Sequence, residues 1–305
     1  MARVLRQTNT GAVADRVILI RFMVLIGLAV LVGSVWAGWH FVYSNPRRVF
    51  WAAVENNLQT FSVVKTNSSN GGGEYNKQQL QAFFSPKHLI MGHEAIQVSG
   101  DGGYAVVRDE MGSPNEDYVR YASIKTDQKN QDGKPVDYKN VIGAWAKSES
   151  GAASAGGQLY QQMALSIVPY GNLPPSQRKE LLTMMEKSVY TPDYGAVDQT
   201  IKDHRPVYTY SVKVNAEAYI TMLKKYASFV GLKNLDQTDP AEFHDAAPVA
   251  FKMDVDVWTR QIHSFTYADG RQDRYDGYGV ALPKNSLPTN TITATELQKR
   301  IQSAR

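Results

Sequence analysis

The 305-residue chain contains no cysteine, and this absence excludes several kinds of chemistry. Disulfide bonds, thiolate metal ligands and cysteine nucleophiles all require the missing side chain. An N-terminal lipid attached through cysteine is excluded for the same reason. A chain of this length can still bury a substantial hydrophobic core without covalent cross-links.

Excess positive charge is also absent from most of the chain, although the sequence pI is about 9.0. Residues 1–48 hold six arginines and one aspartate, a net charge of +5. The whole chain has 33 basic and 29 acidic residues, so positions 49–305 keep 27 basic and 28 acidic ones. Nucleic-acid recognition needs a basic face on the folded domain. We therefore predict no nucleic-acid partner.

Signatures of enzymes are missing as well, since no GxSxG elbow occurs. His88 and His93 are five residues apart in a strand-like segment, whereas a zincin helix needs two histidines four apart. Asp254 and Asp256 point to one face of a predicted strand. We interpret that face as solvated rather than as a catalytic carboxylate pair. The sequence therefore predicts a non-enzymatic protein with no catalytic, metal or cofactor site.

One long apolar run is present, from Phe22 to Tyr43, and it contains no Asp, Glu, Lys or Arg. As a helix, its 22 residues span about 33 Å, close to the roughly 30 Å of a bilayer's hydrocarbon core. A signal-peptidase cut after Ala37 is the alternative, but a cleaved signal has an apolar core of only about 7–15 residues. We predict an uncut transmembrane helix. The expected membrane-interface anchors are the basic and aromatic side chains at the ends of the run: Arg16, Arg21, Trp36, Trp39 and Tyr43.

The orientation of this helix follows from the arginines on its two sides. Four arginines precede the run and two follow it closely, which keeps the N-terminus in the cytoplasm. We predict a single-pass protein of the cell membrane with an extracytoplasmic C-terminal domain. We expect a cytoplasmic basic tail over residues 1–21, a transmembrane helix over 22–43 and a juxtamembrane helix over 44–60. An exported α+β domain should follow over 61–285, and a C-terminal tail with a short helix over 286–305.

The exported domain begins with strand-like segments and continues with a block from about Pro135 to Ser188 that we expect to be mainly helical. The last third has the clearest periodicity. Apolar and polar residues alternate over 207–214, as a half-buried strand requires. A helix follows, with Asn215 as its N-cap and Gly231 as its terminator.

A second alternating stretch, residues 249–257, predicts another strand. Turns at Thr259 and Asp269 then lead into two more antiparallel strands. A strand, a helix and three antiparallel strands predict a sheet with a helix laid over its apolar face.

The stretches "VYTYSVKVNAEAYITMLKKYA" and "VAFKMDVDVWTRQIHSFTYADG" resemble the half-barrel carriers of the LolA and LppX/LprG type. The resemblance is mainly within residues 206–280. It implies a curved antiparallel sheet that wraps over helices and opens a hydrophobic cavity to acyl chains. Those relatives are often soluble or lipid-anchored, whereas this chain has a predicted membrane helix and no cysteine.

The residues expected to line that cavity share the apolar faces of these strands and of the helix between them. They are Tyr208, Tyr210, Val212, Tyr219, Met222, Tyr226, Phe251, Met253 and Val255. The same faces would equally fill a packed core. Two functions therefore remain open: a tethered module that binds a lipid or another hydrophobic ligand, or an envelope protein with a filled core that docks a protein partner at the membrane surface.

Overall fold

The computed structural model describes residues 10–85, 88–100, 102–130, 133–148, 157–232, 235, 238–280 and 286–304. The chain divides into two compact units, Met1–Val49 and Phe50–Arg305.

The first unit is helical. Helix α1 (Thr10–Ala37) makes up most of it, and the π-helix η1 (Gly38–Tyr43) continues the chain. In the described part of the chain, one helical stretch, Met23–Tyr43, is long and apolar enough to cross a membrane. This stretch coincides with the predicted run, although α1 itself begins further toward the N-terminus.

The aromatic residues at the end of this helix are exposed, with 60% of Trp36, 44% of Trp39 and 41% of Tyr43 accessible. The rings of Trp39 and Tyr43 stack with their centroids 4.8 Å apart. The side chains of Arg16 and Arg21 lie outside the described part of the structure. Their role as interface anchors stays a prediction.

Helix α2 (Pro46–Leu58) follows after only Ser44 and Asn45. The Asn45 side-chain oxygen accepts a hydrogen bond from the Arg48 backbone N–H at 3.2 Å. This contact, together with proline in the first helical turn, accounts for the start of the helix.

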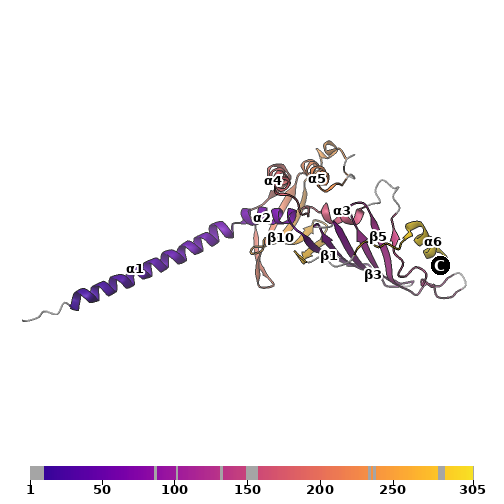
Figure 1. Ribbon diagram of the computed structural model, residues 1–305, viewed down its shortest axis with the longest axis horizontal. Helices are drawn as coiled ribbons and strands as arrows, with labels where there is room; N and C mark the ends of the chain where they lie inside the picture. Colours follow the sequence, from indigo (N-terminus) through magenta and orange to yellow (C-terminus); the bar gives the residue numbers. More distant parts are fainter. Residues whose placement is uncertain are drawn as a thin grey trace, which may run out of the picture. The chain divides into compact units, whose positions relative to one another are not determined.

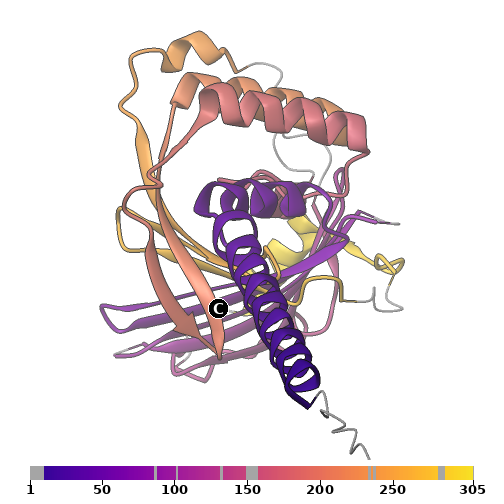
Figure 2. The same cartoon turned by 90° about the vertical axis from the view of Figure 1, so that its left-hand side faces the viewer.

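In the described residues, a single sheet of 13 strands dominates the second unit. Figures 1 and 2 show that this sheet is curved. Its strand order is β13-β6-β5-β4-β3-β2-β1-β12-β11-β10-β9-β7, and β8 also pairs with β9. Neighbouring strands are antiparallel, except that β13 runs parallel to β6. The strands are β1 (Ser62–Gly71), β2 (Glu74–Phe83), β3 (Leu89–Val98), β4 (Tyr104–Gly112), β5 (Asp117–Thr126), β6 (Ala146–Lys147), β7 (Tyr190–Pro192), β8 (Asp198–Lys202), β9 (Arg205–Val214), β10 (Val249–Asp256), β11 (Ile262–Tyr267), β12 (Gln272–Asp276) and β13 (Ile292–Thr293).

The described helices of this unit are short, and α4 and α5 lie side by side in Figure 2. They are α3 (Gln158–Ala164), α4 (Pro175–Met184), η2 (Met185–Val189), α5 (Ala216–Val230), η3 (Pro240–Phe243) and α6 (Ala294–Ala304). The expected helical block from Pro135 to Ser188 is therefore only partly correct. Its first part instead contains irregular chain and strand β6, because backbone pairing to β5 organises it.

Helix α5 has the predicted ends. The Asn215 side-chain oxygen accepts a hydrogen bond from the Ala218 N–H at 2.9 Å, and Gly231 adopts a φ of 75° just after the last turn. Only glycine enters that left-handed conformation without steric cost, so it ends the helix readily.

Aromatic side chains cluster on the concave face of the sheet. The ring of Phe265 lies 5.6 Å from that of Phe251 and 5.4 Å from that of Tyr275, measured between centroids. Tyr275 in turn stacks on Tyr170 at 4.9 Å. Much of the space under the sheet is thus filled by side chains.

Candidate functional site

A cleft of about 470 Å³ remains open between helix α5 and the concave face of the sheet. Its size falls within the range of roughly 300–1,000 Å³ that is typical of small-molecule sites. The lining side chains come from β1, the α3 region, the start of α5, η3 and the strands β9 to β12. They are Lys65, Asn67, Gln162, Leu165, Ser166, Ile167, Val214, Ala216, Tyr219, Ile220, Phe243, Val249, Tyr267, Arg271 and Asp273.

One wall of this cleft is apolar and is built on the first turns of α5. Asn215 caps the start of this helix. Ala216, Tyr219 and Ile220 lie three and four residues apart, so their side chains share one helical face. The Tyr219 hydroxyl donates a hydrogen bond to the Ser166 carbonyl at 3.2 Å, which ties the helix to the loop after α3. Burial raises the pKa of Tyr219, so its hydroxyl keeps the proton that it donates.

The opposite wall is polar and lies on the sheet. Lys65 Nζ is 2.9 Å from Asp273 Oδ2, and their side chains are only 8% and 7% exposed. The Tyr267 hydroxyl donates to the same carboxylate oxygen at 2.9 Å. Burial, followed by the nearby negative charge of Asp273, raises the pKa of Tyr267.

Strand register explains why these charges meet. Lys65 of β1 pairs with Tyr275 of β12, and Asp273 pairs with Phe265 of β11. Since side chains alternate along a strand, Asp273 and Tyr275 point to the same face. That face also carries the buried Phe265, so both charged groups sit on the concave side.

Arg271 completes the polar wall from the turn between β11 and β12. Its guanidinium carbon lies 4.5 Å from the centroid of the Tyr267 ring, a cation–π distance. The Arg271 N–H donates to the Asp269 side chain at 2.9 Å, and Gly270 has a φ of 83°. These contacts define the tight turn that presents Arg271.

Most of the nine residues predicted to line a cavity lie elsewhere in the interior. Tyr219 lines the cleft, and the other eight are each at most 6% exposed. Val212 and Phe251 also border a second hollow of about 740 Å³. Ser211 and Lys252, whose exposed side chains lie on the outer side of the sheet, line the same hollow. Whether any of the nine contacts a ligand stays a prediction.

The two histidines considered for metal binding have separate partners. His93 Nδ1 lies 2.9 Å from Asp109, which also accepts a hydrogen bond from Arg120 at 2.6 Å. His88 Nδ1 lies 2.7 Å from the Tyr160 hydroxyl, and burial lowers the pKa of His88. Over the described residues, no group of three or more His, Asp or Glu side chains is arranged to hold a metal ion.

The prediction that Asp254 and Asp256 lie on a solvated face is wrong. They are 7% and 0% exposed, because side chains from β8 and β9 cover them. Asp254 accepts hydrogen bonds from Lys202 at 2.5 Å, Thr209 at 2.6 Å and Ser264 at 2.8 Å. Burial acts to raise the pKa of Asp254, but these hydrogen bonds outweigh it and hold the pKa below its usual value.

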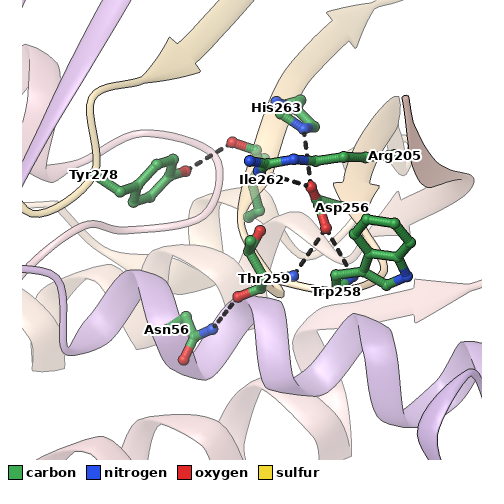
Figure 3. A network of polar contacts seen from close by, with 8 residues as sticks. All are labelled: Asn56, Arg205, Asp256, Trp258, Thr259, Ile262, His263 and Tyr278. Carbon is green, nitrogen blue, oxygen red and sulfur yellow. Dashed lines mark hydrogen bonds and ion pairs between the residues drawn. The ribbon is translucent and has the colours of Figure 1, made fainter. Parts of the chain in front are cut away.

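Asp256 organises the turn between β10 and β11, as Figure 3 shows. One carboxylate oxygen accepts hydrogen bonds from the backbone N–H groups of Trp258 and Thr259, at 2.7 and 2.8 Å. The other lies 3.4 Å from Arg205 and 3.8 Å from His263. Both oxygens therefore have protein partners, which is the arrangement of a structural carboxylate.

Helix α2 and the segment after β12 hold the same turn. Asn56 Nδ2 donates to the carbonyl oxygens of Thr259 and Arg260, at 3.4 and 3.0 Å. Tyr278 donates its hydroxyl hydrogen bond to the Ile262 carbonyl at 2.7 Å (Figure 3). The network thus fixes the base of the β10–β11 hairpin.

Comparison with known proteins returns neither a matching family model nor a matching curated protein. The solved structures that are similar to this chain include two mycobacterial proteins. LprF from Mycobacterium bovis matches with a TM-score of 0.39 at 8% identity, over 79% of this chain and 95% of that one. The lipoprotein LppX of Mycobacterium tuberculosis matches with a TM-score of 0.32 at 10% identity, over 81% of this chain and 100% of that one.

These matches are to the LppX/LprG type of protein that residues 206–280 resemble. Both TM-scores are below 0.5.

Proposed function

We propose that this chain is a single-pass membrane protein whose extracytoplasmic domain binds an amphiphilic, acyl-chain ligand without chemical conversion. The observation that carries the proposal is the cleft beneath the sheet, which has one apolar wall and one polar wall. A ligand with a hydrocarbon tail and a polar head complements two such walls.

The apolar wall offers the tail a surface that is already formed. Leu165, Ile167 and Ile220 present aliphatic side chains, and Phe243 adds an aromatic ring. Transfer of a hydrocarbon chain from water to such a surface is favourable by roughly 0.8 kcal/mol for each methylene group that is fully buried. Apart from Tyr219, the residues predicted from the sequence to line a cavity are buried in the interior of the same domain.

The apolar helix supports anchoring at a membrane. Met23–Tyr43 has the length and composition of a spanning helix, and aromatic residues gather at its end. The arginine excess on the N-terminal side supports an N-terminus in the cytoplasm. A domain held in this way would take its ligand from, or deliver it to, the bilayer beside it.

The second candidate function is docking of a protein partner at the membrane surface. Ile201 of β8 is 80% exposed and Trp258 of the β10–β11 turn is 47% exposed. Ile201 pairs with Pro206, whose carbonyl accepts a hydrogen bond from the Val257 N–H at 2.9 Å, so the two exposed residues lie on adjoining elements. Exposed apolar residues that adjoin one another favour a contact surface.

Photocrosslinking in the membrane tests the ligand directly. A benzophenone amino acid replaces Ile220 in the full chain, and the protein is illuminated in its host cells, purified under denaturing conditions and weighed intact. We expect an added mass that corresponds to a lipid. Matched variants carry the same group at Thr221 or Ser228, which are exposed positions on α5 and do not line the cleft.

Equal lipid adducts at all three positions would show only proximity to the membrane. No lipid adduct at position 220 would contradict the proposal, and a protein adduct at Trp258 replaced in the same way would support the docking function instead.

A further inference from the structure

We infer that the ligand of this cleft carries an acidic head group, a phosphate or a carboxylate, and that Arg271 binds it. The inference deepens the proposed function and rests on it. It follows from the charges on the polar wall, which differ in whether they have a partner of opposite sign.

The charge of Lys65 is already balanced. Its ammonium group lies 2.9 Å from Asp273, and both side chains are more than nine-tenths buried. Asp273 also accepts the Tyr267 hydroxyl on the same oxygen atom. A buried carboxylate with two such donors presents little net negative charge to an incoming anion.

Arg271 is the remaining cation of the wall. Among the residues that the structure describes, no carboxylate lies within ion-pair distance of its guanidinium. Its side chain instead rests on the face of the Tyr267 ring, 4.5 Å from the centroid. A guanidinium placed over an aromatic ring can still present N–H groups to two oxygen atoms of one anion.

The turn that carries Arg271 is well defined. The Tyr267 N–H donates to the Arg271 carbonyl at 2.9 Å, and the Gly270 N–H donates to the Tyr267 carbonyl at 3.0 Å. The guanidinium is therefore placed at the rim of the cleft by a fixed backbone, which reduces the cost of ordering it on binding. The tail would lie along α5 and the head group at this rim.

Paired ligands with one tail and two heads test the inference. Binding of radiolabelled oleate and oleyl alcohol is measured on the full chain in a non-ionic detergent, together with dioleoyl phosphatidic acid and dioleoylglycerol. We expect the wild type to bind each acid more tightly than its neutral partner, by roughly tenfold, as one charge-assisted contact provides. Arg271→Gln should abolish this preference and leave binding of the neutral ligands within about twofold.

Arg274→Gln is the matched control, because it makes the same change in net charge three residues away. Arg274 is exposed, pairs in register with Ser264 and donates to Gln272 at 2.9 Å, and it does not line the cleft. We expect this variant to keep the preference of the wild type.

Three results separate the possible failures. Equal affinity of the wild type for acid and neutral ligands, or equal losses in both variants, would overturn the acidic head group and leave the carrier function standing. Displacement of oleate by inorganic phosphate alone would show a site for free anions and would overturn the amphiphile. Binding of none of the four ligands would contradict the proposed function itself.

Discussion

Replacing Lys65 by methionine should destabilise the domain strongly. The change removes the only ammonium group within ion-pair distance of Asp273 in the described structure and leaves a carboxylate that is 7% exposed. Breaking a buried ion pair by deleting one partner typically costs about 3–5 kcal/mol, because the other charge stays buried without compensation. For a domain of this size, about 2–4 °C is lost per kcal/mol, so the unfolding midpoint should fall by roughly 6–20 °C.

The assay is thermal unfolding of the full chain in detergent, followed by near-ultraviolet circular dichroism. Lys65→Met combined with Asp273→Leu removes both charges and keeps similar volume, and it should recover most of the loss. The two single variants and the double variant make a double-mutant cycle. A loss below about 1 kcal/mol for Lys65→Met, which is the range of a surface ion pair, would contradict a buried, strongly coupled Lys65–Asp273 pair, as would strictly additive effects.

Three further perturbations follow from the same structure. Ile220→Trp should fill the cleft and lower ligand binding at least severalfold at an unchanged unfolding midpoint; binding equal to wild type would place the ligand elsewhere. The pKa of Asp254 is lower in the folded chain than in the unfolded one, so the carboxylate stabilises the fold above the unfolded pKa of about 3.9, and this stabilisation is lost as pH falls through the folded pKa. Asp254→Asn should therefore weaken the fall in the free energy of unfolding at acidic pH. An unchanged fall would contradict this. Because the chain lacks cysteine, Ser228→Cys and Thr8→Cys each introduce a single site for a membrane-impermeant maleimide. We expect Ser228→Cys to react in intact cells and Thr8→Cys to react only after permeabilisation. The reverse pattern would contradict the proposed orientation of the helix.

Local signals in the sequence were sufficient for helix α5. Asn215, the alternating strand before it and Gly231 all lie within one short stretch, and each acts through its own backbone. The same holds for the turn at Asp269, where a side chain bonds the backbone two residues on. Features that depend on neighbours in sequence can be predicted from sequence.

The polar wall of the cleft could not be predicted in this way. Lys65 and Asp273 lie near opposite ends of the domain sequence, and only the pairing of β1 with β12 brings them together. The burial of Asp254 has a similar origin, because Lys202 reaches it from the β8–β9 hairpin. Alternation along β10 indicates which residues share a face but not what covers that face.

Sequence also could not separate core from cavity. Tyr210, Tyr226 and Met253 have the apolar spacing expected of a cavity lining, yet each is fully buried among other side chains. Tyr219, on the same helix as Tyr226, opens onto the cleft instead. The Tyr219 hydroxyl donates a hydrogen bond to the carbonyl of Ser166, in a loop that no periodicity in the sequence predicts.

Native mass spectrometry of the full chain would show whether the domain carries a bound acidic lipid. The protein is extracted from its host membrane in a non-ionic detergent and weighed under conditions that strip the detergent, beside the Ile220→Trp variant. We expect an additional mass on the wild type that extracts into organic solvent as an acidic lipid and is absent from the variant. A bare polypeptide mass for the folded wild type, with no uptake of added oleate or phosphatidic acid, would contradict it.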